Sequence, residues 1–172
     1  YLPQKIELFD GTIAENISTF SPPVDEKGEP VGPRVVEAAM QAGAHELILR
    51  LPNGYETELG LGGAGLSPGQ AQRIALARAL FGSPCVVVLD EPNSHLDQEG
   101  ELVLITALES VRARGGVVFV IAHRLGVLNI VDKIMALRDG RILEFGPRAA
   151  VLAKIGAVKP ETQLRTIGGE RS

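Results

Sequence analysis

The sequence predicts an α/β fold built on a parallel sheet. Two continuous apolar runs rich in valine, Cys85–Leu89 and Val117–Ala122, have the length of strands. A helical stretch, Gly100–Arg114, lies between them, and its apolar side is predicted to consist of Leu102, Ile105, Leu108 and Val111. Unbroken β-branched runs joined by a helix are typical of parallel strands covered on both faces. We therefore expect both strands to be buried.

Length and composition are those of one compact domain. The chain has 172 residues, 45% of them hydrophobic, which is enough to bury a core. The net charge of −4 and the absence of a dense basic run argue against nucleic acid as a partner. No apolar stretch approaches the roughly 20 residues that a membrane helix needs. The single cysteine, Cys85, excludes an internal disulfide, fits a reducing cytosolic environment and is expected to be a small core residue.

Helix and turn signals divide the first 65 residues. Residues 1–20 read as a short strand or loop and then a helix, which begins with a capping box at Thr12–Glu15. Prolines, glycines and charges predict a surface loop over 21–32. The remaining predictions are a helix over Pro33–Leu51 that is interrupted near Gly43, a turn at Pro52–Gly54 and a glycine-rich loop over 56–65.

The C-terminal part contains a strong hairpin signal. Residues Ile134–Phe145 alternate between apolar and polar around Asp139-Gly140, a dipeptide that favours a two-residue hairpin turn. A last helix is expected over Pro147–Ile155, and the tail from Gly156 is expected to be loose. The chain begins with Tyr1 rather than methionine, and we expect further sequence upstream.

A second capping box begins the helix at Ser67. Serine at the cap, Pro68 at the first helical position and Gln70 three residues after the cap start the helix, and good helix formers continue it to Leu80. Its buried face is expected to contain Ile74, Leu76, Ala77 and Leu80. Such a helix start presents free N–H groups and the positive dipole end, which suits a phosphate. An ordinary capped helix has the same features.

The first apolar run ends in two carboxylates, Asp90 and Glu91. Ligands of parallel sheets lie beyond the carboxyl ends of the strands, where these two residues fall. Taken alone, the two acids would simply end a strand at a solvated turn. Their significance comes from the order of motifs along the chain.

Residues 66–97 read LSPGQAQRIALARALFGSPCVVVLDEPNSHLD, and His123 follows after one more helix and strand. This order resembles the ATP-binding-cassette (ABC) ATPases: signature motif, Walker B strand, D-loop and H-loop. By this resemblance Asp90 holds Mg²⁺, Glu91 is the general base that polarises the attacking water, and His123 contacts the γ-phosphate of ATP. A histidine at a strand end is otherwise often structural, so the role of His123 is assigned only because the other motifs of the family accompany it.

Further nucleotide-facing residues follow from the same resemblance. Ser67, Gly69 and Gln70 match the signature LSGGQ, whose helix start faces ATP held by a partner subunit; Pro68 replaces its first glycine. Asp97 resembles the D-loop aspartate, which crosses the dimer interface. Gln4 resembles the Q-loop glutamine near Mg²⁺ and the attacking water, because KIELFDGTIAENI follows it. We interpret His95 as surface variation and His45 as an ordinary residue without metal-ligand spacing.

The resemblance implies a P-loop-type core whose N-terminal part is missing from this chain. No GxxxxGK[ST] phosphate loop occurs in the sequence. We expect residues 1–156 to be a partial nucleotide-binding domain: a helical subdomain over about 10–80 and a catalytic core over 81–156, followed by a flexible tail over 157–172. Without the phosphate-loop lysine, the isolated chain is expected to bind Mg-ATP very weakly and to be inactive. The sheet is also expected to keep a hydrophobic edge open.

Within the family, LFDGTIAENI, HELILRLPNGYETELG and LDEPNSHLD look most like type I secretion ATPases of the protease and lipase exporter branch. That resemblance implies a homodimer with an upstream transmembrane domain, at the cytoplasmic face of a bacterial inner membrane. Its further partners would be a periplasmic adaptor, an outer-membrane channel and an unfolded secreted protein. The segment after Gln4 and the loop at 57–60 would contact the membrane domain.

Several alternatives stay open. The cassette could serve an exporter of lipids or small molecules, or it could be a non-catalytic fragment. A DNA-repair or chromosome-maintenance ATPase shares the motifs, but the distance from Gln4 to Ser67 leaves no room for its long coiled coil. A soluble translation-type cassette is disfavoured by the exporter-like LFDGTIAENI segment.

Overall fold

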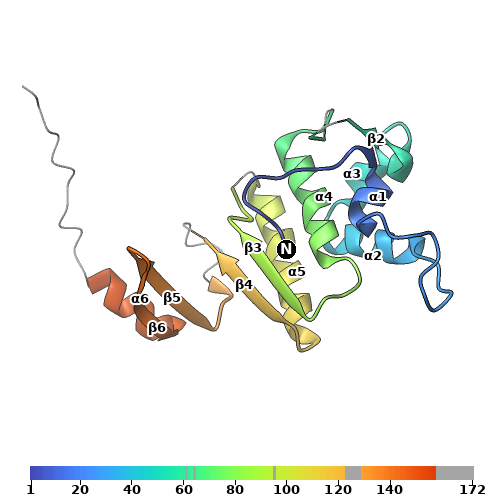
Figure 1. Ribbon diagram of the computed structural model, residues 1–172. Helices are drawn as coiled ribbons and strands as arrows, with labels where there is room; N and C mark the ends of the chain where they lie inside the picture. The colour runs from blue at the N-terminus through green and yellow to red at the C-terminus, as the bar shows by residue number, and fades with distance from the viewer. Residues whose placement is uncertain (61, 64, 95, 123–128, 158–172) are drawn as a thin grey trace, which may run out of the picture. The chain divides into compact units, whose positions relative to one another are not determined.

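The computed structural model describes residues 1–60, 62–63, 65–94, 96–122 and 129–157. The chain divides after Ile130 into two compact units, and each is described by itself (Figure 1). None of the helices in the described ranges is long and apolar enough to cross a bilayer.

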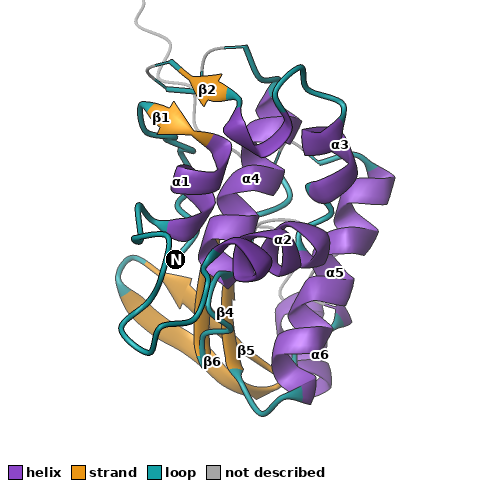
Figure 2. Ribbon diagram, turned by 90° about the vertical axis from the view of Figure 1, so that its right-hand side faces the viewer, coloured by secondary structure: helices purple, strands orange, loops and turns teal. Residues whose placement is uncertain are grey.

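Four helices form the first half of the larger unit: α1 (Ile13–Ser18), α2 (Gly32–Gln41), α3 (His45–Leu49) and α4 (Pro68–Leu80). Helix α4 packs against α1 and α2, and the group is seen clearly in Figure 2. A short 3-10 helix, Gly54–Glu56, and a two-residue ladder between β1 (Gly11–Thr12) and β2 (Glu58–Leu59) complete it. The core is continuous with the sheet, because the same buried cluster includes Ile17, Ile74, Leu80, Leu89 and Leu104.

Parallel pairing of strands organises the rest of this unit. Strand β3 (Val86–Asp90) pairs with β4 (Val117–Ile121) in parallel, from Val86 opposite Val117 to Asp90 opposite Ile121. The other edge of β3 is occupied by Leu2, whose N–H donates to Val88 O and whose carbonyl accepts from Asp90 N–H, both at 2.9 Å. Helix α5 (Gln98–Ala113) connects the strands and packs against β4. The predicted parallel α/β core is therefore present.

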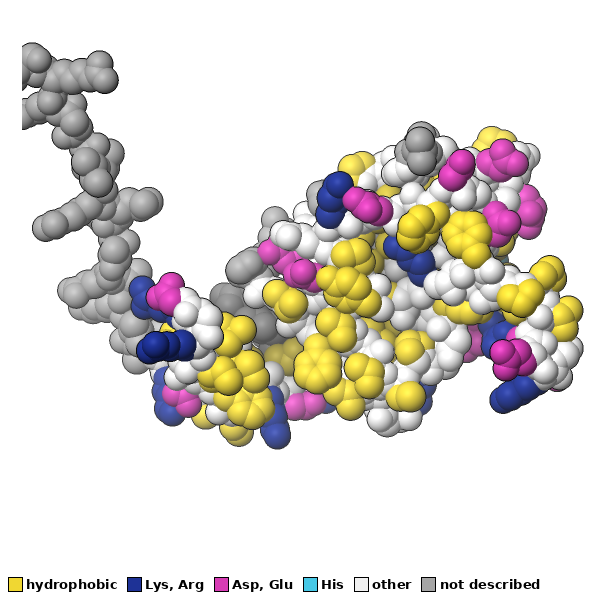
Figure 3. Space-filling model, viewed as in Figure 1, with side chains coloured by type: hydrophobic (Ala, Val, Ile, Leu, Met, Phe, Trp, Pro, Cys, Tyr) yellow, Lys and Arg dark blue, Asp and Glu magenta, His cyan; other side chains and the backbone are white. Residues whose placement is uncertain are grey.

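The expectation that both strands are buried on both faces was wrong. In β3, Val87 and Leu89 are fully buried but Val86 is 55% exposed; in β4, Val117, Phe119 and Ile121 are each at least 50% exposed. These side chains form an apolar patch on the face turned away from α5 (Figure 3). Cys85, expected in the core, is exposed as well. The reason is that α5 covers one face of the sheet and no described helix of this unit covers the other.

The predicted apolar side of α5 was also partly wrong. Leu102 is 65% exposed, and the buried stripe is Leu104, Ala107, Leu108 and Val111. A series with a constant spacing of three drifts by about 180° around a helix over three steps, since a turn takes about 3.6 residues. Leu102 and Val111 therefore cannot lie on one face, whereas spacings of three and four stay aligned.

The predicted local signals of the N-terminal half are confirmed. At α1, Thr12 Oγ1 accepts from Glu15 N–H at 3.1 Å and Glu15 Oε2 accepts from Thr12 N–H at 2.7 Å. The helix predicted over Pro33–Leu51 is interrupted where expected: α2 ends at Gln41, Gly43 adopts a positive φ of 61°, and α3 begins at His45.

The smaller unit is a hairpin with one helix. Strands β5 (Lys133–Arg138) and β6 (Arg141–Pro147) are antiparallel, and Asp139 and Gly140 both have positive φ, as a two-residue primed turn requires. Helix α6 (Arg148–Ala157) packs against both strands. The predicted hairpin and last helix are confirmed, and the rest of the tail lies outside the described residues.

Gly43 provides a test of this fold. A Cβ at this position would lie 2.7 Å from Val103 Cγ1 on α5, in addition to the cost of the positive φ. Gly54 is the matched control, because its φ is also positive (52°) but a Cβ there would have nothing within 4 Å. We expect Gly43→Ala to destabilise the protein by about 2–3 kcal/mol and Gly54→Ala by about 1 kcal/mol, measured by urea denaturation. Equal losses would contradict the close approach of Gly43 to α5.

Candidate nucleotide site

The parallel pairing brings three predicted site residues to one edge of the sheet. Leu2 lies beside Leu89, so Gln4 leaves the sheet at the same end as Asp90 and Glu91. Asp90 is half-buried at the last position of β3, and Gln4 is exposed. Strand β4 ends at Ile121, opposite Asp90, so the chain leaves this strand at the same edge. His123 itself lies outside the described residues.

Glu91 is held in an unusual backbone conformation. Its φ is 48°, in the left-handed region, and proline follows it. A side chain other than glycine pays about 1–3 kcal/mol for this conformation, so the surrounding bonds must hold it. Its N–H donates to Ile121 O of β4 at 2.8 Å, and its carbonyl accepts from Ser94 N–H at 3.2 Å. In proteins, backbone strain of this kind is often found at functional sites.

The predicted signature helix starts as expected. Ser67 Oγ accepts from Gln70 N–H at 3.3 Å, and Gln70 Oε1 accepts from Ser67 N–H at 2.8 Å, which confirms the capping box. Pro68 occupies the first helical position, where its missing N–H costs no hydrogen bond. The predicted buried residues Ile74, Leu76, Ala77 and Leu80 are all buried.

Asp97 lies beside this helix. It caps α5, since its Oδ1 accepts from Gly100 N–H at 2.8 Å, and the same oxygen is 3.6 Å from Arg73 Nη2 of α4. The side chain of Asp97 remains 73% exposed, so its other carboxylate oxygen can reach outward. Arg73 also donates to Gly43 O at 3.3 Å. The segment after β3 is thus attached to the signature helix.

Two further polar residues of α4 were missed from the sequence. Gln72 is only 3% exposed, and its Nε2 donates to the carbonyl of Pro92, next to Glu91. Arg78 Nη2 donates to Glu7 O at 3.0 Å, and its guanidinium lies 5.3 Å from the centre of the Phe9 ring. Burial lowers the pKa of Arg78. The sequence could have pointed to these two residues, because they are polar and lie on a helix most of whose other side chains are apolar and buried.

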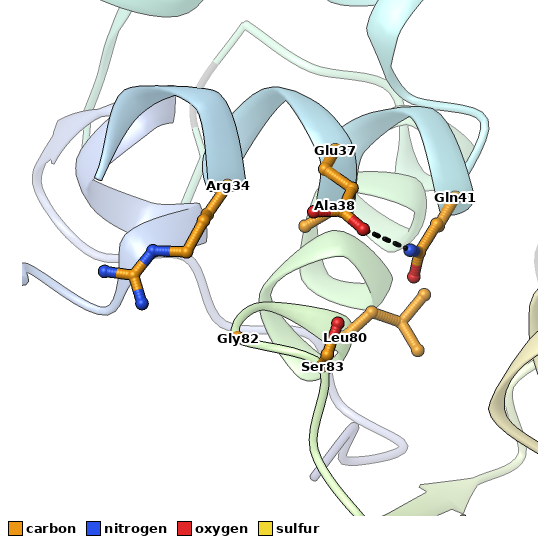
Figure 4. Close-up of a pocket in the computed structure, with 7 residues that line it drawn as sticks. All are labelled: Arg34, Glu37, Ala38, Gln41, Leu80, Gly82 and Ser83. Carbon is orange, nitrogen blue, oxygen red and sulfur yellow. Dashed lines mark hydrogen bonds between the residues drawn. The ribbon is translucent and has the colours of Figure 1, made fainter. Parts of the chain in front are cut away.

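Two pockets of the described structure are lined by residues other than the predicted site residues. One lies between α2 and the end of α4, where Glu37 accepts a hydrogen bond from Gln41 at 3.2 Å beside Leu80 (Figure 4). The other is a groove between Met40 and α5. The predicted residues Asp90 and Glu91 lie instead at the carboxyl end of β3.

The chemistry of the edge fits a nucleotide and its magnesium ion. Carboxylate and amide oxygens, as in Asp90 and Gln4, are ligands suited to Mg²⁺, which commonly keeps several waters and substrate oxygens. Among the residues that the structure describes, no cluster of three or more His, Cys, Asp or Glu side chains forms a metal cage. His45, predicted to be ordinary, contacts the Tyr55 hydroxyl through Nδ1 at 2.9 Å, and burial raises the pKa of Tyr55.

Comparison with known proteins identifies the family. The family model described as ABC transporter matches residues 1–94, more than half of the chain. The chain belongs to the ABC transporter family. A bacterial Atm1-family ABC exporter with ATP bound has a similar structure, with a TM-score of 0.76, 34% identity and coverage of 88% of this chain. The fold of this cassette is accordingly that of an ABC ATPase.

Among curated relatives, the chain is 53% identical over 155 residues to the type I secretion system ATP-binding protein PrsD of Rhizobium meliloti (strain 1021), with 90% of the chain covered. It is 44% identical over 162 residues, 94% of the chain, to the ATP-dependent lipid A-core flippase of Chromohalobacter salexigens. The chain spans 26% and 27% of the lengths of these relatives, and 26% of the exporter of known structure.

The capping box at Ser67 can be tested directly. Ser67→Ala removes the acceptor for Gln70 N–H and is expected to cost about 1 kcal/mol of unfolding free energy. Ser110→Ala, within α5, is the control and should be neutral or slightly stabilising, because alanine has the higher helix propensity. Urea denaturation of both variants measures the difference. A neutral Ser67→Ala would contradict the cap.

Proposed function

We propose that this chain is part of the ATP-hydrolysing cassette of an ABC exporter that secretes proteins by the type I route. The observation that carries ATP hydrolysis is the turn after β3, where Asp90 and the left-handed Glu91 stand at the carboxyl edge of a parallel sheet. The secretion branch is supported by the 53% identical relative, which is named a type I secretion ATP-binding protein.

Each predicted residue has a distinct proposed role. Asp90 and Gln4 would hold Mg²⁺, which offsets the charge of the phosphates when bound. Glu91 accepts a proton from water as the water oxygen bonds to the γ-phosphorus and the bond to the β–γ bridging oxygen breaks. His123 would contact the γ-phosphate. Ser67, Gly69, Gln70 and Asp97 would serve the nucleotide of a second copy of the cassette, in a homodimer.

The proposed setting is that of the whole exporter. The helical subdomain over about 10–80 and the core over 81–156 would lie at the cytoplasmic face of a bacterial inner membrane, beneath a transmembrane domain. For type I secretion, the further partners are a periplasmic adaptor, an outer-membrane channel and an unfolded secreted protein. Export of lipids or small molecules is the second candidate, favoured by the 44% identical relative named a lipid A-core flippase.

Glu91→Gln in the full-length protein tests the catalytic role. Because the amide cannot accept the proton of water, ATP hydrolysis should fall by at least about 100-fold while ATP binding persists. Glu99→Gln, at the start of α5, is the matched control and should keep activity. Steady-state phosphate release and equilibrium nucleotide binding measure the two effects. Near-normal turnover by Glu91→Gln would exclude this residue as the base.

The 172-residue chain alone should bind Mg-ATP very weakly and should not hydrolyse it. The physical reason is the absence of a phosphate loop, whose backbone N–H groups and lysine neutralise the phosphates. Isothermal titration calorimetry and a phosphate-release assay measure both properties. Turnover by the chain that is abolished in Glu91→Gln would contradict the expectation.

The transported class is tested with the full-length protein in lipid vesicles. An unfolded secreted protein with a C-terminal signal should stimulate ATP hydrolysis, and the same protein without its signal should not. Stimulation by lipid A-core alone would instead favour the second candidate.

A further inference from the structure

We propose that Gln72 is a positioning residue for Glu91: it links the signature helix α4 to the turn that carries the candidate base of the same chain. The inference rests on the proposed function, since it assigns Glu91 the role of base. Gln72 would act through its hydrogen bond to the backbone of Pro92.

The contact is buried and specific. Gln72 lies in the second turn of α4 and is only 3% exposed, yet its Nε2 reaches the carbonyl of Pro92 across the interface between the helix and the turn. Pro92 directly follows Glu91. The donor of Gln72 therefore fixes the peptide group next to the residue whose orientation matters for catalysis.

A requirement for packing alone does not explain a glutamine at this position. Within the described residues, its Oε1 is buried and has no hydrogen-bond partner. A buried polar atom without a partner is unfavourable, so an apolar side chain of the same length would fill the space better. The glutamine makes physical sense if its Nε2 contact has a use that offsets this cost.

The turn needs such support because its backbone is strained. Glu91 has a φ of 48° and precedes a proline, which restricts its conformation further. Its own backbone bonds go to Ile121 on β4 and to Ser94 within the turn. Gln72 adds a third fixed point, from the helix. These three contacts hold the backbone from which the Glu91 side chain extends.

The link also connects two parts of the proposed machinery. The start of α4 at Ser67 is assigned to the nucleotide of the partner cassette, whereas Glu91 serves this chain's own nucleotide. Because Ser67 and Gln72 belong to one continuous helix, a displacement of the helix start is passed to Pro92. Gln72 thereby connects the state of one nucleotide site to the geometry of the other.

The test uses the full-length protein with Gln72→Met, which keeps the length and helix propensity of the side chain but removes the donor. We expect kcat for ATP hydrolysis to fall by about tenfold, with KM for ATP changed by less than about twofold, because a displaced base affects the chemical step and not binding. Hydrogen exchange of the peptide that contains Ser94 should be faster than in the wild type.

Ile17→Val is the stability control, since it removes one methyl from a fully buried side chain in α1 that forms no part of the hydrogen bond between Gln72 and Pro92. It should lower Tm without changing kcat or exchange near Ser94. Gln72→Asn is a second variant, which keeps a buried amide but is too short by one methylene to reach Pro92. It should behave as Gln72→Met does.

Unchanged kcat, or unchanged exchange near Ser94, in a folded Gln72 variant would overturn the inference. So would a finding that Ile17→Val lowers kcat as much as the Gln72 variants do at an equal decrease in Tm, because the loss would then reflect stability alone. If the wild-type parent protein does not hydrolyse ATP, the proposed function fails instead, and the exchange measurement still decides whether Gln72 holds the turn.

Discussion

The parallel pairing of β3 with Leu2 on one side and β4 on the other is the constraint on which the candidate site depends. Because all three segments run in the same direction, their carboxyl ends meet at one edge of the sheet. Gln4 is far from Asp90 and Glu91 in the sequence and reaches that edge only through this pairing. A shift of Leu2 by one residue would turn its buried side chain to the opposite face and move Gln4 away from the carboxylates.

Helix α4 also organises the candidate site, because its polar side chains form hydrogen bonds with three separate loops. Apolar packing fixes α4 against α1 and α2, but apolar contacts are not directional. Direction comes from hydrogen bonds: Gln72 to Pro92, Arg73 to Gly43, and Arg78 to Glu7. These bonds attach one helix to the turn after β3, to the α2–α3 junction and to the segment that follows Gln4. The helix can therefore hold three separate loops in a fixed relation to one another.

The features that the sequence predicts well in this chain are formed by residues close together in the sequence. Both capping boxes and the Asp139-Gly140 turn depend on residues within a few positions of each other, and all three are present in the structure. Burial of the sheet was predicted less well, because the exposure of Phe119 depends on what covers the second face and not on the strand itself. The contacts of Gln72 and Arg78 join distant segments, so periodicity could show that the helix is buried but could not name the partners.

The charges at the candidate edge explain why the proposed site is only one part of a nucleotide-binding surface. Asp90 and Glu91 are both acids, and the chain carries a net charge of −4. ATP brings several further negative charges, and like charges at contact distance repel by about 1 kcal/mol per pair even in water and by more near a protein surface. The start of α4, which the proposed function assigns to the nucleotide of the partner cassette, carries only partial positive charge. In the proposed function, the edge therefore supplies a base and ligands for a divalent cation, which offsets part of the negative charge of the phosphates.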